Sequence, residues 1–126
     1  MTAYPNTQIL GNYATGARQT APNPSGAVAI VPPTALAIEV TITNYQGMHG
    51  RPAAQFVAIA NKFPKAEVTV TKDGMDVNGK SILGLMMLAA GPGTVLRIAG
   101  SGDGCEGMLD ELKRLVEARF GEEGPP

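Results

Sequence analysis

Hydrophobic and polar positions follow a readable period only from about residue 37 onward. Ile38, Val40 and Ile42 alternate with polar residues, which is the period of a half-buried strand. The same pattern, together with the turn-forming residues that separate the segments, predicts four strands: residues 38–42, 67–71, 75–78 and 94–99. Asp73-Gly74 separates the second from the third and is a strong hairpin signal, so these two strands should pair antiparallel.

Three stretches carry apolar residues at spacings of three and four and are predicted as helices: residues 51–63, 81–88 and 105–120. Pro52 falls in the first turn of the first helix, where a missing N–H group costs nothing. Ser81 is placed to cap the second helix. Asp103, followed three residues later by Glu106, resembles a capping box for the third.

The element order β-α-β-β-α-β-α predicts an α+β fold, in which three helices cover one face of an antiparallel sheet. The preceding stretch holds five prolines and a single charged side chain, Arg18. We therefore expect a flexible Pro/Gly/Thr-rich tail over residues 1–36, a folded domain over residues 37–121 and a disordered end over residues 122–126. A docking or tethering role for the tail stays open.

Composition narrows the class of protein further. A chain of 126 residues is the size of one domain with one core. Its net charge of -1 and pI of about 5.7 argue against a nucleic-acid binder. No apolar run reaches the ~18 residues that a membrane span needs, and the N-terminus lacks the pattern of a secretory signal. The single Cys105 excludes an internal disulfide and a multi-cysteine zinc site. We expect a soluble cytoplasmic protein without a cofactor.

His49 is the only histidine and lies just before the first predicted helix. A helix start presents unpaired N–H groups and a positive dipole end, which suit an anion. Arg51 adds a guanidinium that can bind phosphate oxygens in pairs, and Gly47 and Gly50 let the backbone approach a ligand. A phosphoryl group on His49 fits this setting. No nucleotide-binding loop is present, so the group would have to come from another protein.

Ser81 has two interpretations. It can be a purely structural N-cap, or it can be a regulatory phosphorylation site at the start of the second helix. The side chains that follow, Ile82, Leu83 and Met86, form a possible partner-binding surface together with Met48. Of the two consecutive methionines at 86 and 87, we expect one to point inward and the other outward.

Three segments resemble the HPr family, the histidine-containing phosphocarriers of the phosphoenolpyruvate-dependent phosphotransferase system. M-H-G-R-P-A-A-Q-F is similar to the family's active-site segment, and V-N-G-K-S-I-L-G-L-M-M-L is similar to its regulatory-serine segment. G-P-G-T-V-L-R-I-A-G-S-G-D-G resembles the family's fourth strand and its exit. The resemblance covers residues 37 to 123. It implies an open-faced β-sandwich with three helices over a four-stranded antiparallel sheet.

The resemblance also implies roles for single residues. His49 would accept phosphate at Nδ1 from Enzyme I and pass it to IIA-type acceptors, in sugar uptake or a regulatory phosphorelay. Arg51 would orient the phosphate. Ser81 would be the serine that HPr kinase/phosphorylase modifies, which impairs transfer from Enzyme I. The chain would be a carrier and not an enzyme, and a monomer is expected because one face must meet several partners.

Some positions depart from the family pattern. Ala58 and Asn61 stand where many relatives carry lysines that help to bind partners. Gly50 stands where relatives commonly have Thr or Ala. An alternative function is a regulatory module that acts mainly through phospho-Ser81 bound to a transcriptional regulator. A third possibility, suggested only by the Pro-rich tail, is a domain related to a multidomain phosphotransferase.

Overall fold

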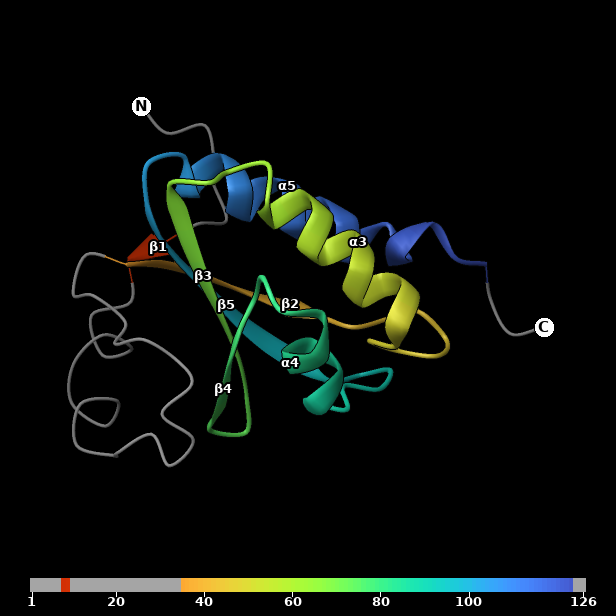
Figure 1. Cartoon of the computed structure of the whole chain (residues 1–126). Coiled ribbons are helices and arrows are strands. Elements are labelled where there is room, and N and C mark those ends of the chain that lie inside the picture. Colours follow the sequence, from red (N-terminus) through yellow and green to blue (C-terminus); the bar gives the residue numbers. More distant parts are fainter. Residues whose placement is uncertain (1–7, 10–34, 124–126) are drawn as a thin grey trace.

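The computed structural model describes residues 8–9 and 35–123. Its strands are β1 (Gln8–Ile9), β2 (Leu36–Thr41), β3 (Ala66–Lys72), β4 (Met75–Asn78) and β5 (Val95–Gly102). They form one sheet in the order β1-β2-β5-β3-β4, in which every neighbouring pair is antiparallel (Figure 1). The four predicted strands and the predicted hairpin are confirmed, and β1 is an addition at the edge of β2.

Three helices and one short 3-10 turn complete the fold: α3 (Gly50–Ala60), α4 (Ile82–Met87), α5 (Cys105–Glu117) and η1 (Arg119–Gly121). Helix α5 packs on β2 and β5 and lies beside α3 (Figure 1). Helix α4 packs on α3 and β4. The predicted α+β arrangement, with three helices over an antiparallel sheet, is confirmed. None of the helices within the described ranges is long and apolar enough to cross a bilayer.

The alternating pattern predicts correctly which side of each strand is buried. The inner face of the sheet contributes buried residues from four strands: Ile38, Val40, Val68, Val70, Val77, Leu96 and Ile98. Phe56 of α3 and Leu109 and Leu112 of α5 close this core from the helix side. On the opposite face, Glu39 lies directly across from Arg97 and pairs with it at 3.2 Å. Burial of each large apolar side chain stabilises the fold by about 1.5–3 kcal/mol.

The N-terminal boundary differs from the prediction in the part that the structure describes. Most of the segment predicted as a flexible tail lies outside the described residues. Gln8 and Ile9, however, pair with Ala37 and Leu36, and Ala35 is buried. An edge strand leaves unpaired N–H and C=O groups that a second segment can satisfy. The folded domain therefore includes Ala35 and Leu36, just ahead of the predicted start at residue 37.

The capping box predicted for the last helix is not formed. The N-cap of α5 is Gly104, which has a φ of 86° and no side-chain cap. Gly102 also has a positive φ, and a Cβ there would lie 2.3 Å from the carbonyl oxygen of Lys65. This pair of glycines turns the chain sharply from β5 into α5, so Asp103 between them is exposed and does not cap the helix.

Candidate functional site

His49 occupies the N-cap position of α3, at the end of the loop that leaves β2. Its side chain is 35% exposed, and its carbonyl oxygen accepts the first helical hydrogen bond from the N–H of Ala53, at 2.9 Å. Pro52 has no N–H group. Within residues 35–123, the backbone N–H groups of Gly50 and Arg51 have no acceptor. The start of α3 therefore offers two unpaired donors beside the imidazole.

The loop that carries His49 is hydrogen-bonded to the segment after α4. The N–H of Met48 donates to the carbonyl oxygen of Ala90 at 2.8 Å. Gly47 has a φ of 70°, and a Cβ at this position would lie 2.3 Å from that same oxygen. Only glycine fits such a close approach in this conformation. Gly47 thus positions the loop, whereas a Cβ on Gly50 would meet no atom within 4 Å.

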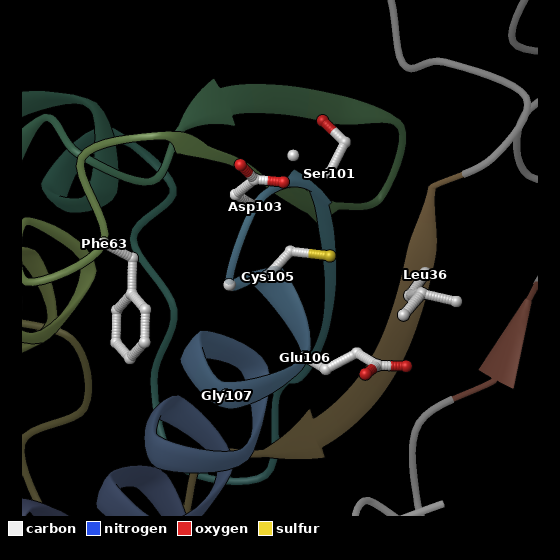
Figure 2. A pocket seen from close by; sticks show the side chains of 9 residues that line it. Leu36, Phe63, Ser101, Asp103, Cys105, Glu106 and Gly107 are labelled. Carbon is white, nitrogen blue, oxygen red and sulfur yellow. The ribbon is translucent and has the colours of Figure 1, made fainter.

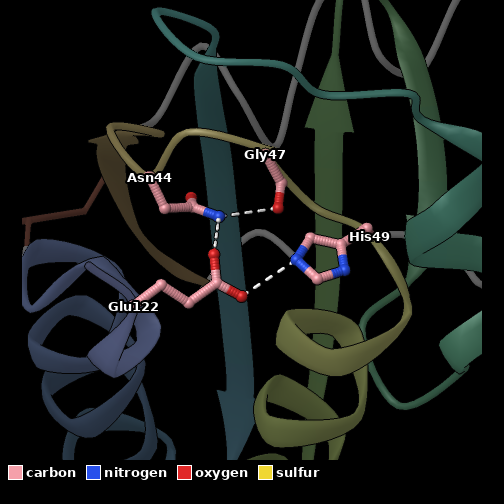
Figure 3. Close-up of polar contacts among 4 residues, drawn as sticks. All are labelled: Asn44, Gly47, His49 and Glu122. Carbon is pink, nitrogen blue, oxygen red and sulfur yellow. Dashed lines mark hydrogen bonds and ion pairs between the residues drawn. The ribbon is translucent and has the colours of Figure 1, made fainter. Parts of the chain in front are cut away.

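Asn44 and Glu122 form a short chain of hydrogen bonds that ends at the imidazole of His49 (Figure 3). The buried Asn44 donates through Nδ2 to the carbonyl oxygen of Gly47 at 2.8 Å and to Oε1 of Glu122 at 3.0 Å. The other carboxylate oxygen of Glu122, Oε2, lies 2.9 Å from Nε2 of His49. Glu122 falls in the end predicted to be disordered, and here the structure differs, because this side chain is held by two partners.

The contact with Glu122 determines which ring nitrogen of His49 carries the proton. The hydrogen bond from Asn44 lowers the pKa of the Glu122 carboxyl below its ordinary value of 4.5, and this effect outweighs the cost of desolvation. The hydrogen bond and the charge of His49, and the charge of Arg51, lower this pKa further. An ionised carboxylate can only accept a hydrogen bond, so Nε2 must donate. Neutral His49 then keeps a lone pair on Nδ1, which has no hydrogen-bond partner among the described residues.

Glu122 reaches the site because the chain turns left-handed after α5. Arg119, Phe120 and Gly121 have φ values of 59°, 55° and 73°. Non-glycine residues in this region cost about 1–3 kcal/mol each. The buried side chain of Phe120 offsets part of this cost, because its burial contributes about 1.5–3 kcal/mol. Sequence reasoning missed Glu122, although Phe120, the last member of the apolar stripe, was a signal that the chain end stays packed.

Arg51 projects from the first turn of α3 and is exposed. It forms no ion pair or hydrogen bond with another residue in the described part of the chain, although its charge helps to lower the pKa of Glu122. The structure thus places the predicted guanidinium on the turn that follows His49, where it is free to bind an anion.

Ser81 caps α4 as predicted. Its Oγ accepts a hydrogen bond from the N–H of Gly84 at 2.9 Å, and its side chain is only partly exposed. The hydroxyl therefore has a structural role in the unmodified chain. A purely structural role and a regulatory one remain compatible with this position.

The predicted partner-binding residues separate into two groups. Ile82, Leu83 and Met86 are exposed on α4, with Leu83 at 70%. Met48 is only 4% exposed and belongs to the core, so its side chain is unavailable to a partner. It points inward because the loop around it is pinned to Ala90.

The prediction for the two consecutive methionines was wrong, since both Met86 and Met87 are exposed. Helix α4 has only six residues, and only a narrow stripe of its surface faces the core. That stripe is filled by Leu85 and by Leu88, the residue just after the helix, both of which are buried. No inward position is left for a methionine.

A separate hollow of about 610 Å³ opens at the start of α5, and none of its lining residues belongs to the His49 site (Figure 2). Cys105 and Glu106 of α5 line it together with Phe63, which lies between α3 and β3 in the sequence. Burial raises the pKa of the Cys105 thiol, and the charge of Glu106 raises it further, so the thiol stays protonated. The described residues contain no group of three or more His, Cys, Asp or Glu side chains that could hold a metal ion.

Comparison with known proteins identifies the family of this chain. Residues 36–118 match the family model described as "PTS HPr component phosphorylation site". The phosphocarrier protein HPr of Xylella fastidiosa (strain Temecula1) is 40% identical over 85 residues, which cover 68% of this chain and 94% of that protein. HPr of Pseudomonas aeruginosa is 42% identical over 87 residues, covering 68% and 96%.

A solved structure of HPr from Thermoanaerobacter tengcongensis is similar in fold as well. It superposes with a TM-score of 0.66 at 41% identity and covers 69% of this chain and 97% of its own. The family match, the identities and the shared fold agree with one another. The chain belongs to the HPr family and is a phosphocarrier protein of the phosphotransferase system.

Proposed function

We propose that this chain accepts a phosphoryl group on Nδ1 of His49 from Enzyme I and passes it to IIA-type acceptors, in sugar uptake or a regulatory phosphorelay. The observation that carries the proposal is the hydrogen bond between Nε2 of His49 and the Glu122 carboxylate. It leaves Nδ1 with its lone pair, partly exposed and beside the unpaired N–H groups of α3.

The transfer can be written as a single displacement. The Nδ1 lone pair of His49 attacks phosphorus, and the P–N bond of the donor phosphohistidine breaks, returning its electron pair to the donor imidazole. Because Nε2 still holds its proton at that moment, the His49 ring becomes cationic. The Glu122 carboxylate, 2.9 Å from Nε2, stabilises this charge. Loss of the phosphoryl group to an acceptor reverses each change.

The phosphoryl oxygens would meet positive groups at the start of α3. The free N–H groups of Gly50 and Arg51 point from the helix terminus, and the Arg51 guanidinium can bind two oxygens at once. These interactions strengthen as negative charge spreads over the oxygens during transfer. They orient the group and do not form a bond with it, so loss of Arg51 should slow transfer without preventing it.

Ser81 is proposed as a regulatory phosphorylation site for an HPr kinase/phosphorylase. A phosphate on its Oγ would add about two negative charges next to the exposed side chains of Ile82 and Leu83. Enzyme I would then have to dock onto a charged surface in place of an apolar one. The partner-binding residues proposed here are Ile82, Leu83, Met86 and also Met87, and the carrier is proposed to act as a monomer.

The test is incubation with phosphoenolpyruvate and purified Enzyme I, followed by mass mapping under non-acidic conditions. The expected product is an acid-labile, base-stable phosphate on His49. His49→Ala should abolish the label while the chain remains folded, because the side chain contributes no core contact. Arg51→Ala should label more slowly than wild type. Label on the His49→Ala variant would contradict the assignment.

The alternative, a regulatory module acting mainly through phospho-Ser81 bound to a transcriptional regulator, gives a different result in the same experiment. A folded wild-type chain would then remain unlabelled with Enzyme I from its own source. Treatment with HPr kinase would instead place an acid-stable phosphate on Ser81.

A further inference from the structure

Asn44 is a fully buried polar side chain close to His49. The described residues include only two buried polar or charged side chains, and the other, Thr71, lies on β3. A buried amide costs free energy unless its polar groups find partners. Nδ2 of Asn44 donates to the carbonyl oxygen of Gly47 at 2.8 Å and to Oε1 of Glu122 at 3.0 Å (Figure 3). Both hydrogens of the amide are therefore used.

The oxygen of the same amide has no such partner. Oδ1 of Asn44 is buried and accepts no hydrogen bond from the described residues. A buried acceptor without a donor destabilises the fold, and an apolar side chain of similar shape, such as leucine, would avoid this cost. Packing alone therefore does not explain an amide at this position. The two hydrogen bonds that Nδ2 donates are the feature that a leucine could not supply.

The two acceptors around Asn44 determine which way its amide faces. Turning the amide over would place Oδ1 against the carbonyl oxygen of Gly47 and the carboxylate of Glu122. A carbonyl and an ionised carboxylate only accept hydrogen bonds, so the turned amide would lose both bonds. Asn44 therefore donates to both groups at once, and each bond holds the amide in the orientation that the other bond needs.

Both acceptors also contact His49. The carbonyl oxygen of Gly47 accepts a hydrogen bond from the backbone N–H of His49 at 2.9 Å, so it helps to position the backbone at the start of α3. The Glu122 carboxylate lies 2.9 Å from Nε2 of the ring. Asn44 thus joins the group that positions the His49 backbone to the group that positions its imidazole, although neither of its two hydrogen bonds goes to His49 itself.

From these contacts we infer that Asn44 is a positioning residue for phosphoryl transfer, which holds the Glu122 carboxylate against Nε2 of His49 and thereby keeps the lone pair on Nδ1. The inference rests on the proposed function, since Nδ1 is taken to form the bond to phosphorus. Without Asn44, the Glu122 side chain loses one of its two partners and can rotate away from the ring. The imidazole would then divide its proton between both nitrogens, and a smaller fraction of the protein would be ready to react.

A double-mutant cycle in the full chain tests whether Asn44 acts through Glu122. Asn44→Leu keeps a branched side chain of similar shape and removes the donor. We expect it to slow phosphorylation by Enzyme I about fivefold on its own, and less than about twofold when Glu122→Ala is already present. The effects do not add, because Glu122→Ala has already removed the carboxylate that Asn44 holds. Single-turnover rates, measured well below the melting temperatures of all four proteins, give these ratios.

The tautomer of His49 provides a readout that does not depend on transfer. Nitrogen chemical shifts of the imidazole should show less protonation at Nε2 in Asn44→Leu than in wild type, since Glu122 is no longer held there. Gln46→Ala is the matched control, because it removes an exposed amide from the same loop, and it should keep the wild-type shifts. If Asn44→Leu does not fold, Asn44→Ala removes the same hydrogen bonds with a smaller side chain and takes its place.

Two results would overturn the inference. Wild-type shifts and a wild-type rate in Asn44→Leu would show that its hydrogen bonds do not position the ring. Equal slowing with and without Glu122→Ala, at unchanged nitrogen shifts, would show that Asn44 supports only the loop through Gly47. If the shifts respond as expected but Enzyme I does not label the wild type, the proposed function is wrong, whereas the effect of Asn44 on the tautomer holds.

Discussion

Glu122 accepts a hydrogen bond from Nε2 of His49, at 2.9 Å, across 73 positions of sequence. The contact joins the loop before α3 to the turn after α5, and Asn44 holds the carboxylate in place from the other side. The loop after β2 and the turn after α5 thus meet at the imidazole. We propose Glu122 as a positioning residue, because its contact is with Nε2 of His49 and not with Nδ1.

Glu122→Ala should change the tautomer of His49. Without the acceptor at Nε2, the ring loses its preference for a proton on that nitrogen, and a fraction of the neutral form will carry it on Nδ1. Nitrogen chemical shifts of the imidazole measure this fraction directly. The rate of phosphorylation by Enzyme I should fall by about tenfold, the effect of roughly 1.4 kcal/mol, because the cationic ring loses its partner.

Glu123→Ala is the control for this variant. Glu123 is the next carboxylate along the chain and is exposed. It should keep the wild-type tautomer and rate. If Glu122→Ala slows transfer while the nitrogen shifts remain those of the wild type, Glu122 acts by another route than positioning the proton.

The lowered pKa of the Glu122 carboxyl predicts a pH-dependent contribution to stability. A carboxyl whose pKa is lower in the folded than in the unfolded chain stabilises the fold above its ordinary value, here 4.5, and loses this effect as the pH falls through the folded pKa. Wild type should therefore exceed Glu122→Gln in free energy of unfolding by a constant amount at neutral pH. The difference should shrink below pH 4.5. Urea titrations across this range measure it, and a pH-independent difference would contradict it.

Gly47→Ala should destabilise the domain at the loop that carries His49. The new Cβ would lie 2.3 Å from the carbonyl oxygen of Ala90, and the backbone would be strained at a φ of 70°. We expect a loss of about 2 kcal/mol or more in the free energy of unfolding. Gly91→Ala is the matched control, because its Cβ would meet nothing within 4 Å. It should change stability by no more than about 0.5 kcal/mol.

Substitutions of Ser81 separate its capping role from regulation. Ser81→Ala removes the acceptor for the Gly84 N–H and should cost about 1 kcal/mol of stability without slowing transfer from Enzyme I. Ser81→Asp keeps a good N-cap, so its melting temperature should stay near that of wild type while transfer slows about tenfold or more. Transfer by Ser81→Asp at the wild-type rate would speak against the proposed regulation.

Local features of the fold could be predicted from the sequence because their causes are local. The Asp73-Gly74 turn, with both φ values positive, determines the β3–β4 hairpin, and the Ser81 cap depends on a residue three positions away. The buried faces of the strands follow from their period of two. The absent capping box at Asp103 shows the limit, since two left-handed glycines at the exit of β5 take the chain in another direction.

The site was only half predictable for a related reason. His49 and Arg51 lie two residues apart, so the start of a single helix determines the position of both. Glu122 depends on a left-handed turn at Arg119 and Phe120, which local preference disfavours and only the burial of Phe120 explains. The inward Met48 likewise depends on a contact with Ala90, more than forty positions away, so no nearby pattern reveals it.

The short pairing of β1 with the start of β2 has a practical consequence for handling the protein. Leu36 lies at the end of β2 that pairs with Gln8 and Ile9. His49 follows the other end of β2, beyond a strand whose six residues span roughly 20 Å. A linkage attached at Leu36 would therefore lie about one strand length from His49. We expect a protein immobilised there to keep the proposed phosphoryl-accepting end open to the solution.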